Sequence, residues 1–579
     1  MDRRLQAPNS GSNYNFNDKL IRPSVPRSMF DLSHLFSTTI PSVGSIIPIA
    51  LFETLPGDSF ELSVSALLRV LPQVVPMYSR QRLSIHAFYS TFNDLWVNSN
   101  TFFTRGYTGN TVFNIPSGDA LSFNNKLTDT FNLDTSIVPY MIPALESKPV
   151  STWVNTRLNL LPLMMYKRIF RDYYMNKNYY INSREWLPDS DDDFRLDNQG
   201  HLISFGASTP ARLGDLMYRD FPDDYFLSAF PSPQRGTAPT LDFSLDIPDL
   251  FRSNFTNNDL PTRPFFEGID LPAGSTSDML TLKGDIHGAP FNVNNPDFST
   301  SWQRVGSNAM SIALNAHLFD SAVFNSTITL NQIRELAVAQ SVLEKMAKTD
   351  GSYGDFGLTF FGIVPRAANV HRPIYIGGTI QPIMFSEVLQ TVDTETNPLG
   401  SYAGHGISGG SSGYLGRVNC DDYGYIMIVA SVIPDVYYSQ GIDLLWTKSL
   451  QTDMYLPERA RLGLRPILNK ELYFSNDATV DNDIFAYQSP YEEFRYQNNR
   501  IAGKMASPTH TNFWPYTQSR YFTDTPQYSQ EFATMQDNVR MTFLAAPTEV
   551  PYTAQFSIQC RAVRPLPYRP IPSDLGVSR

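Results

Sequence analysis

The stretch SFELSVSALLRV (59–70) alternates apolar and polar side chains over most of its length. Successive side chains of a β-strand point to opposite faces, so this period of two predicts a strand with one buried face. Its apolar set is Phe60, Leu62, Val64, Ala66 and Leu68. A second stretch near the other end of the chain, TAQFSIQCRA (553–562), has the same period. It predicts a strand that carries on one face Ala554, Phe556, Ile558, Cys560 and Ala562.

Further strand and helix signals lie between these two ends, separated by long irregular stretches. Strands are expected where β-branched and aromatic residues gather, at 82–92, 357–363, 424–433 and 541–546. Helices are expected at 163–178 and at 330–349. Strands near both ends of one chain predict a single β-sandwich with long insertions and argue against a string of independent domains.

The composition is typical of a chain that is enclosed by neighbours. Charged residues make up 17% of its 579 residues, below the usual quarter, while aromatic residues reach 13% and prolines number 42. With so few charges, much of the surface must be uncharged, which suits a subunit whose faces are covered by other subunits. We therefore expect a component of a larger assembly.

The net charge of −11 hides two basic ends. Residues 1–28, rich in Asn, Ser, Gly and Pro, are expected to form a flexible arm. This arm and residues 561–579 each carry three more cations than anions, which suggests contact with an anionic partner such as DNA. The candidate contacts in the arm are Arg3, Arg4, Lys19 and Arg22. Solvated tails without a partner are the alternative.

No catalytic, cofactor-binding or metal-binding site is expected. The eight histidines are scattered, and the acidic run at 189–194 lacks the glycine and the glutamate of a calcium loop. The segment GHGISGGSSGYLG (404–416) contains Gly-x-Ser-x-Gly around Ser408 and around Ser411. Its six glycines predict a flexible loop instead of the strand–turn–helix of a nucleophile elbow. We therefore expect a protein that is not an enzyme.

Targeting signals are not expected either. The start of the chain contains no apolar stretch like that of a secretory signal peptide. The chain also has no uninterrupted run of about 18 apolar residues, so no membrane-spanning helix is expected. The two cysteines, Cys420 and Cys560, lack the spacing of a metal site or a disulfide framework, which indicates synthesis in a reducing cytoplasm.

Basic and aromatic residues are interleaved in two segments, KRIFRDYYMNKNYY (167–180) and YEEFRYQNNRIAGK (491–504). Such mixtures can pair phosphates and stack bases, so Lys167, Arg168 and Arg171 are candidate DNA contacts. The alternatives are a helix with a basic outer face in the first segment, loop packing in the second, and subunit contacts in either.

The segment DYFLSAFPSPQRG (224–236) crowds three aromatic residues before two prolines, which exclude regular structure across its second half. It resembles a hallmark of the major capsid protein of microviruses, small icosahedral single-stranded-DNA phages. The gokushovirus-like form of that hallmark reads Asp-Tyr-Phe-Thr-Ser-Ala-Leu-Pro-Trp-Pro-Gln-Lys-Gly. This chain differs from it at Leu227, Phe230, Ser232 and Arg235. Other blocks resemble the family in the same order, among them RSMFDLSH (27–34), LPGDSF (55–60), LPLMMYKRIFRDYYMNKN (161–178) and YLPERARLG (455–463).

The resemblance implies an all-β fold, an eight-stranded antiparallel jelly roll of the viral-capsid type with long interstrand insertions and a few helices. It implies one capsid domain over 29–579 and self-assembly into a T=1 icosahedral shell of about 60 copies around circular single-stranded DNA. Further implied partners are a small basic DNA-packaging protein and a host surface receptor. The virion would be assembled in the bacterial host cytoplasm.

Two segments acquire roles through the resemblance. The irregular stretch 237–325 is the candidate surface protrusion, used in host attachment. The stretch 224–236 is the candidate interface loop, anchored in a neighbouring subunit or in the barrel. Its anchoring residues are Tyr225, Phe226, Phe230, Pro231, Pro233 and Arg235. The alternative function is a glycan-binding or glycan-cleaving β-sandwich protein, because aromatic-rich irregular loops also suit sugars.

Overall fold

The computed structural model describes most of the chain outside its N-terminal arm. The described residues are 25–119, 136–145, 157–180, 214–239, 330–349, 353–364, 372–389, 402–409, 413–535 and 549–568, apart from single positions within them, and three short strands between 269 and 292. The chain divides into two compact units, residues 1–235 together with 343–579, and residues 236–342.

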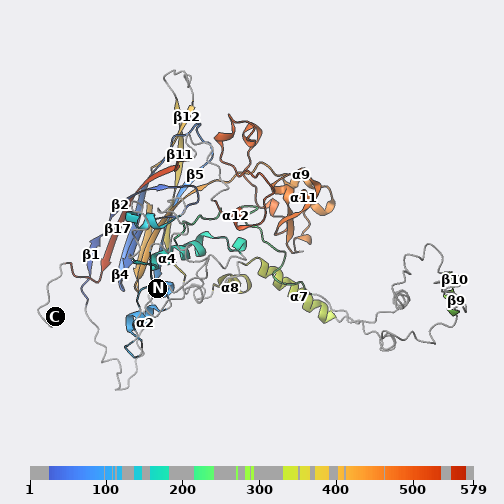
Figure 1. Ribbon diagram of the computed structural model, residues 1–579, viewed down its shortest axis with the longest axis horizontal. Coiled ribbons are helices and arrows are strands. Elements are labelled where there is room, and N and C mark those ends of the chain that lie inside the picture. Colours follow the sequence, from blue (N-terminus) through green and yellow to red (C-terminus); the bar gives the residue numbers. More distant parts are fainter. Residues whose placement is uncertain are drawn as a thin grey trace. The chain divides into compact units, whose positions relative to one another are not determined.

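The first unit is built on one large antiparallel sheet that curls around its core (Figure 1). Its strands are β1 (Ser28–Asp31), β2 (His34–Ile40), β3 (Ile47–Thr54), β4 (Asp58–Val70), β5 (Gln81–Thr91), β11 (Ile374–Leu389), β12 (Tyr402–Gly409), β13 (Gly413–Cys420), β14 (Gly424–Pro434) and β17 (Tyr552–Arg564). Their order is β1-β17-β4-β12-β11-β5-β14-β3, with β13 also paired to β4 and β2 to β17. The architecture is therefore mostly β, as expected.

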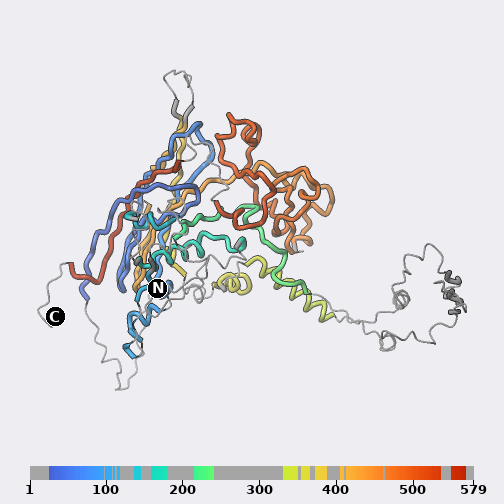
Figure 2. Tube along the Cα trace, viewed as in Figure 1, coloured from blue at the N-terminus to red at the C-terminus, as the bar shows by residue number. Residues whose placement is uncertain are grey.

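The two alternating stretches at opposite ends of the chain pair with each other. In the register of β4 and β17, Phe556 lies opposite Ala66 and Ile558 lies opposite Val64. Figure 2 shows the C-terminal red strand running beside the N-terminal blue ones. The apolar members of both stretches are buried, and the polar members between them are half-buried or exposed. Both predicted strands and their buried faces are confirmed.

Most helices in the described residues are short, and α7 (Leu330–Ala347) is the longest of them. The others are α1 (Phe92–Leu95), α2 (Ser99–Thr104), α3 (Val138–Met141), α4 (Leu161–Ile169), α8 (Tyr353–Phe361), α9 (Leu444–Thr447), α10 (Asn469–Leu472), α11 (Ala478–Asn482) and α12 (Gln530–Ala533). A π-helical turn, η5 (Phe170–Tyr174), continues α4. The 3₁₀ turns are η3 (Pro143–Leu145), η6 (Lys177–Tyr180), η11 (Gln451–Asp453), η12 (Arg459–Arg461), η13 (Glu492–Phe494), η14 (Gly503–Ala506) and η15 (Trp514–Tyr516). The helices expected at 163–178 and 330–349 are thus present, although the first ends earlier.

Three small sheets complete the described structure. β6 (Ser117–Asp119) pairs with β7 (Arg157–Asn159), and β15 (Arg465–Leu468) pairs with β16 (Ile484–Gln488). In the second unit, β8 (Ile269–Asp270), β9 (Thr281–Ile286) and β10 (Ala289–Asn292) form a three-stranded antiparallel sheet. None of the helices in the described residues is long and apolar enough to cross a membrane.

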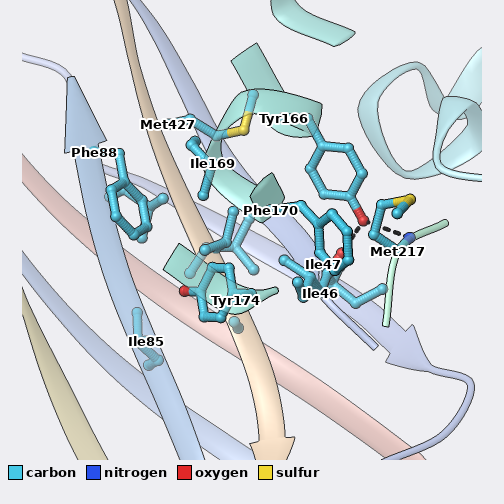
Figure 3. Close-up of a cluster of buried hydrophobic side chains, with 14 of the residues drawn as sticks. Ile46, Ile47, Ile85, Phe88, Tyr166, Ile169, Phe170, Tyr174, Met217 and Met427 are labelled. Atoms are coloured by element: carbon cyan, nitrogen blue, oxygen red, sulfur yellow. Dashed lines mark hydrogen bonds between the residues drawn. The ribbon is translucent and has the colours of Figure 1, made fainter. Parts of the chain in front are cut away.

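One part of the core of the first unit lies between α4 with its π-helical turn and the strands β3, β5 and β14. Figure 3 shows Tyr166, Ile169 and Phe170 pointing toward side chains of these strands. Tyr166 is fully buried, and its hydroxyl donates to Ile46 O at 2.9 Å while accepting from Met217 N at 2.9 Å. Because this buried hydroxyl has both a hydrogen-bond acceptor and a hydrogen-bond donor as partners, moving it out of water costs little free energy. The layer of aromatic side chains can therefore also contain hydrogen bonds.

The strand predicted at 357–363 is wrong, because these residues lie largely in the helix α8. A short apolar run does not by itself distinguish a strand from a buried helix. In α8 the rings of Phe356 and Phe360, one helical turn apart, lie 4.8 Å from each other. Gly362 follows with a φ of +68°, the left-handed geometry that ends many helices. The strand predicted at 541–546 lies outside the described residues.

The flexible loop predicted at 404–416 is also wrong where the structure describes it. Residues 404–409 belong to β12 and residues 413–416 to β13, both paired to β4. Glycine serves close packing here: a Cβ at Gly404 would lie 2.4 Å from Gln73 Oε1. Ser408 is buried in β12 and donates to Pro382 O at 3.0 Å, so it is a sheet residue and not an exposed nucleophile.

Candidate functional site

The first half of the 224–236 segment is a turn organised by a buried carboxylate. Asp224 Oδ1 accepts hydrogen bonds from Phe226 N at 2.9 Å and Leu227 N at 2.8 Å, and Tyr438 donates its hydroxyl proton to Oδ2 at 2.6 Å. Burial raises the pKa of Asp224, while these hydrogen bonds act in the opposite direction. The aspartate at the head of this segment therefore shapes the turn.

The aromatic residues after Asp224 tie the turn to the region around β16. Tyr225 donates to Glu471 Oε2 at 3.0 Å, and Gln488 Nε2 donates to Tyr225 O at 2.8 Å. Phe230 and Tyr487 exchange backbone hydrogen bonds of 2.7 and 2.8 Å, as a single bridge between two strands does. The turn thereby joins segments more than 200 residues apart in the sequence.

A buried arginine that sequence analysis did not identify completes this region. The Arg520 side chain is almost fully buried, and its guanidinium lies over the rings of Phe532 at 4.0 Å and Phe221 at 4.6 Å. Its Nη1 also donates to the Tyr438 hydroxyl at 3.3 Å, which connects it to the carboxylate of Asp224. Cation–π contacts of this kind are strongest when the pair is desolvated. No local motif around Arg520 could have revealed this role.

The structure therefore divides the predicted interface loop into two parts. Tyr225 and Phe226 are buried within their own subunit, which favours the expected anchoring in the subunit itself over anchoring in a neighbour. Phe230 and Pro231 are half-buried, whereas Pro233 and Arg235 are exposed. The Arg235 backbone N–H donates to Leu343 O at 3.1 Å, and its guanidinium donates to Thr349 Oγ1 at 3.3 Å. Of the predicted anchoring residues, only Pro233 and Arg235 are exposed on the subunit.

The first basic–aromatic segment, 167–180, begins within α4, and most residues of that helix are buried in the core. Lys167 is buried, with Nζ donating to Asp215 O at 3.0 Å and lying 2.8 Å from Met217 Sδ. The prediction that Lys167 contacts DNA does not fit this burial, because the ammonium is bound inside the subunit. Arg168 is half-buried and donates to Asp94 O at 3.2 Å.

The carboxylate of Asp172, in the same segment, lies near four cations. Burial raises the pKa of Asp172, and the charges of Arg168, Arg171, Lys177 and Arg372 oppose that rise. Arg372 donates to Asp172 O at 2.8 Å and stacks its guanidinium over Tyr173 at 4.6 Å. The half-buried Arg168 and Arg171 thus belong to a positively charged group that includes an aromatic ring.

The second basic–aromatic segment, 491–504, is far more exposed. The exposed fraction of Phe494 is 63% and that of Tyr496 is 41%, so loop packing does not account for these rings. Arg495 pairs with Glu492 at 2.8 Å, and Arg500 pairs with Asp443 at 2.7 Å. Both rings are thus available on the surface of the isolated subunit.

Several predicted sites lie wholly or largely outside the residues that the structure describes. Arg3, Arg4, Lys19 and Arg22 of the arm lie outside them, and so does most of the segment 237–325. Within the described part of the chain, no three His, Cys, Asp or Glu side chains gather in a way that could hold a metal ion. Cys420 and Cys560 are buried free thiols, and burial raises the pKa of each to about 12, which suppresses thiolate chemistry.

The family and the relatives that this chain resembles are all described as capsid proteins. The family described as "Capsid protein (F protein)" matches residues 20–573. Capsid protein VP1 of Chlamydia phage 1 is 26% identical over 597 residues, covering 95% of this chain and 96% of that protein. Capsid protein VP1 of Bdellovibrio phage phiMH2K is 25% identical, covering 98% and 99%. Capsid protein VP1 of Spiroplasma virus 4 is 24% identical, covering 88% and 87%.

Proposed function

Since the chain belongs to the capsid protein (F protein) family and is a structural major capsid protein of a phage virion, we propose that it assembles into a T=1 icosahedral shell around circular single-stranded DNA. The observation that carries this proposal is the match along nearly the whole chain, from residue 20 to residue 573. It decides against the glycan-binding alternative. Closed shells of identical subunits need several self-complementary contacts on each copy, and about 60 copies make the smallest icosahedral shell.

The strand pairing supports an eight-stranded jelly roll as the shell-forming domain. Taken in chain order and with β1 and β12 left aside, the strands β2, β3, β4, β5, β11, β13, β14 and β17 pair first with last, second with seventh, third with sixth, and fourth with fifth. This nesting is what results when one long antiparallel hairpin is folded over itself. The two four-stranded halves are then β2-β17-β4-β13 and β3-β14-β5-β11.

The N-terminal arm is our candidate for genome contact. Its local excess of three positive charges contrasts with the net charge of −11 for the whole chain. A small basic packaging protein would supply the remaining neutralisation of the DNA. Binding of single-stranded DNA weakens with salt by a slope of about −0.7 per neutralised phosphate, so a few cations have a measurable effect.

Replacing Arg3, Arg4, Lys19 and Arg22 with Gln tests this contact. Particles of this variant should lose DNA at lower salt than the parent, while their shells remain intact in negative-stain images. DNA content is measured in purified particles across a salt series. Equal DNA content at every salt concentration would exclude the arm as a genome contact, and an absence of particles from the parent chain would refute shell formation itself.

The segment 237–325 is our candidate for the receptor-binding protrusion. Its support is the division of the chain, since residues 236–342 form a compact unit of their own while the sheet belongs to the other unit. Segments inserted between the elements of a rigid scaffold commonly carry recognition, because they can vary without disturbing the core. The host surface receptor would then meet this unit first.

A further inference from the structure

A pocket lies beside α9, in the long excursion between β14 and β17. Its volume is about 430 Å³. Its lining includes the side chains of Lys448, Asp453, Arg459, Arg465, Lys470 and Tyr491. A concave site of this size holds a few side chains of a partner and not a whole domain.

The wall of the pocket is cationic. Of its lining residues, four are positively charged and one, Asp453, is negatively charged. The carboxylate of Asp453 accepts from Ser449 N at 3.0 Å and from Leu450 N at 2.8 Å, and these hydrogen bonds lower its pKa. Arg459 donates to Thr452 O at 3.0 Å, and Lys470 donates to Asn482 Oδ1 at 3.1 Å, so both cations bond to neutral oxygens.

Two carboxylates behind the wall hold the other cations in place. Lys448 pairs with Glu493 at 2.8 Å. Arg465 pairs with Glu493 at 3.3 Å and with Glu471 at 3.4 Å. Lys448 and Arg465 are thus paired, whereas Arg459 and Lys470 form no ion pair with a described carboxylate, so an anionic group of a partner can complement these two cations.

An apolar rim continues from this pocket. Its exposed fractions range from 55% to 76%, unusually high for such large side chains. The rim consists of Leu445, Trp446, Leu450, Met454, Tyr455 and Phe494. The rings of Tyr455 and Phe494 lie 6.4 Å apart, and the Lys448 ammonium lies 4.4 Å above Phe494, which joins the rim to the pocket wall.

The rim is large enough to matter in an assembly contact. Burying an aromatic side chain removes about 150–250 Å² from water, so covering Trp446, Tyr455 and Phe494 from their present exposure would bury roughly 300–480 Å². One partner of a standard protein interface contributes about 800 Å². Exposed Trp, Tyr and Met around a pocket with arginine are also the residue types that dominate binding energy at interfaces.

We propose that the pocket and its rim form a socket for an acidic segment of a neighbouring copy of this chain. The inference rests on the proposed shell, in which every subunit must bind others of its kind. The charge balance of the chain favours this occupant, because 56 acidic residues against 45 basic ones make the surface of another copy acidic on average. The apolar rim buries against the same neighbour and supplies the area that charge pairs alone lack.

Charge reversal in the socket tests the proposal. The double variant Arg459→Glu with Lys470→Glu should reduce particle yield at least tenfold, because two repulsive charges then face the acidic segment. Trp446→Ala should also reduce yield, without any change of charge. Lys348→Glu, a charge reversal on an exposed lysine just beyond α7, is the matched control and should assemble as the parent does. The folding of each unassembled subunit is followed by circular dichroism and its thermal midpoint.

The neighbour is identified by cross-linking. A photoreactive residue is placed at position 446 in full-length chain, and shells are assembled from a mixture of isotopically light and heavy copies. Cross-linked peptides that join a light copy to a heavy one at an acidic segment are expected. Cross-links to DNA alone, or normal assembly of well-folded socket variants, would overturn the socket while leaving shell formation by the parent in place. A parent chain that forms no particles would refute the shell and the socket together.

Discussion

Removing one buried hydroxyl, by Tyr166→Phe, should destabilise the subunit far more than its size suggests. The Tyr166 hydroxyl donates to Ile46 O and accepts from Met217 N, each at 2.9 Å, in a region closed to water (Figure 3). The variant keeps the ring and leaves no cavity large enough for a methyl group. Its cost therefore comes almost entirely from two backbone groups that lose their shared partner.

The size of the effect follows from the two groups. A buried donor or acceptor left without a partner costs about 1–3 kcal/mol, so the loss of both partners in Tyr166→Phe should lower the free energy of unfolding by about 2–6 kcal/mol. That is a large fraction of the roughly 5–15 kcal/mol that a folded domain typically has. Urea denaturation of the unassembled subunit measures it as a lower midpoint with an unchanged slope.

A surface tyrosine provides the control. Tyr78 is 62% exposed and stacks on Tyr516 at 5.5 Å, so Tyr78→Phe makes the same chemical change where water can replace the hydroxyl's partners. We expect a change within about 0.5 kcal/mol for this control. If Tyr166→Phe also falls within about 0.5 kcal/mol, the hydroxyl does not bridge Ile46, the residue before β3, to Met217 as the geometry indicates.

Three further outcomes are expected. Phe556→Ala, at a fully buried position of β17, should cost about 3–5 kcal/mol in urea denaturation, and an unchanged midpoint would refute the packing of that strand. His86 has its pKa lowered to about 4, first by burial and then by Arg219. The unfolded chain binds a proton at His86 near pH 6.5, whereas the folded chain does so only near pH 4. The free energy of unfolding is therefore unaffected by this group above pH 6.5 and should fall by at most about 1.4 kcal/mol per pH unit between pH 6.5 and pH 4. His86→Gln should remove this slope. Replacing an inner part of 237–325 with a Gly/Ser linker should leave particles intact but abolish host adsorption, whereas loss of particles would assign the segment to the contacts of the shell.

The parts of the fold that sequence reasoning predicted correctly are those with a local signature. Alternation identified β4 and β17 together with their buried faces, and β-branched runs identified β5 and β14. The segment 224–236 indicated the family, but the sequence left open whether its aromatic residues anchor in a neighbouring subunit or in the barrel. The structure buries Tyr225 and Phe226 within their own subunit. The sequence could not decide this, because an aromatic residue looks the same in it whether it is buried in its own subunit or in a partner.

By itself, the sequence determined which strands are half-buried, the shortage of charge that marks a subunit, and the capsid family. Only the tertiary structure decided that β4 pairs with β17, that 404–409 is strand, that 357–361 is helix, and that Lys167 is bound inside the core. The physical reason is that periodicity along a strand is a property of neighbours in the chain, which any short window contains. Other features depend on residues that are far apart in the sequence and meet only once the chain has folded. They include the burial of a charge, the close approach of a glycine to another backbone, and the pairing of strands nearly 500 residues apart.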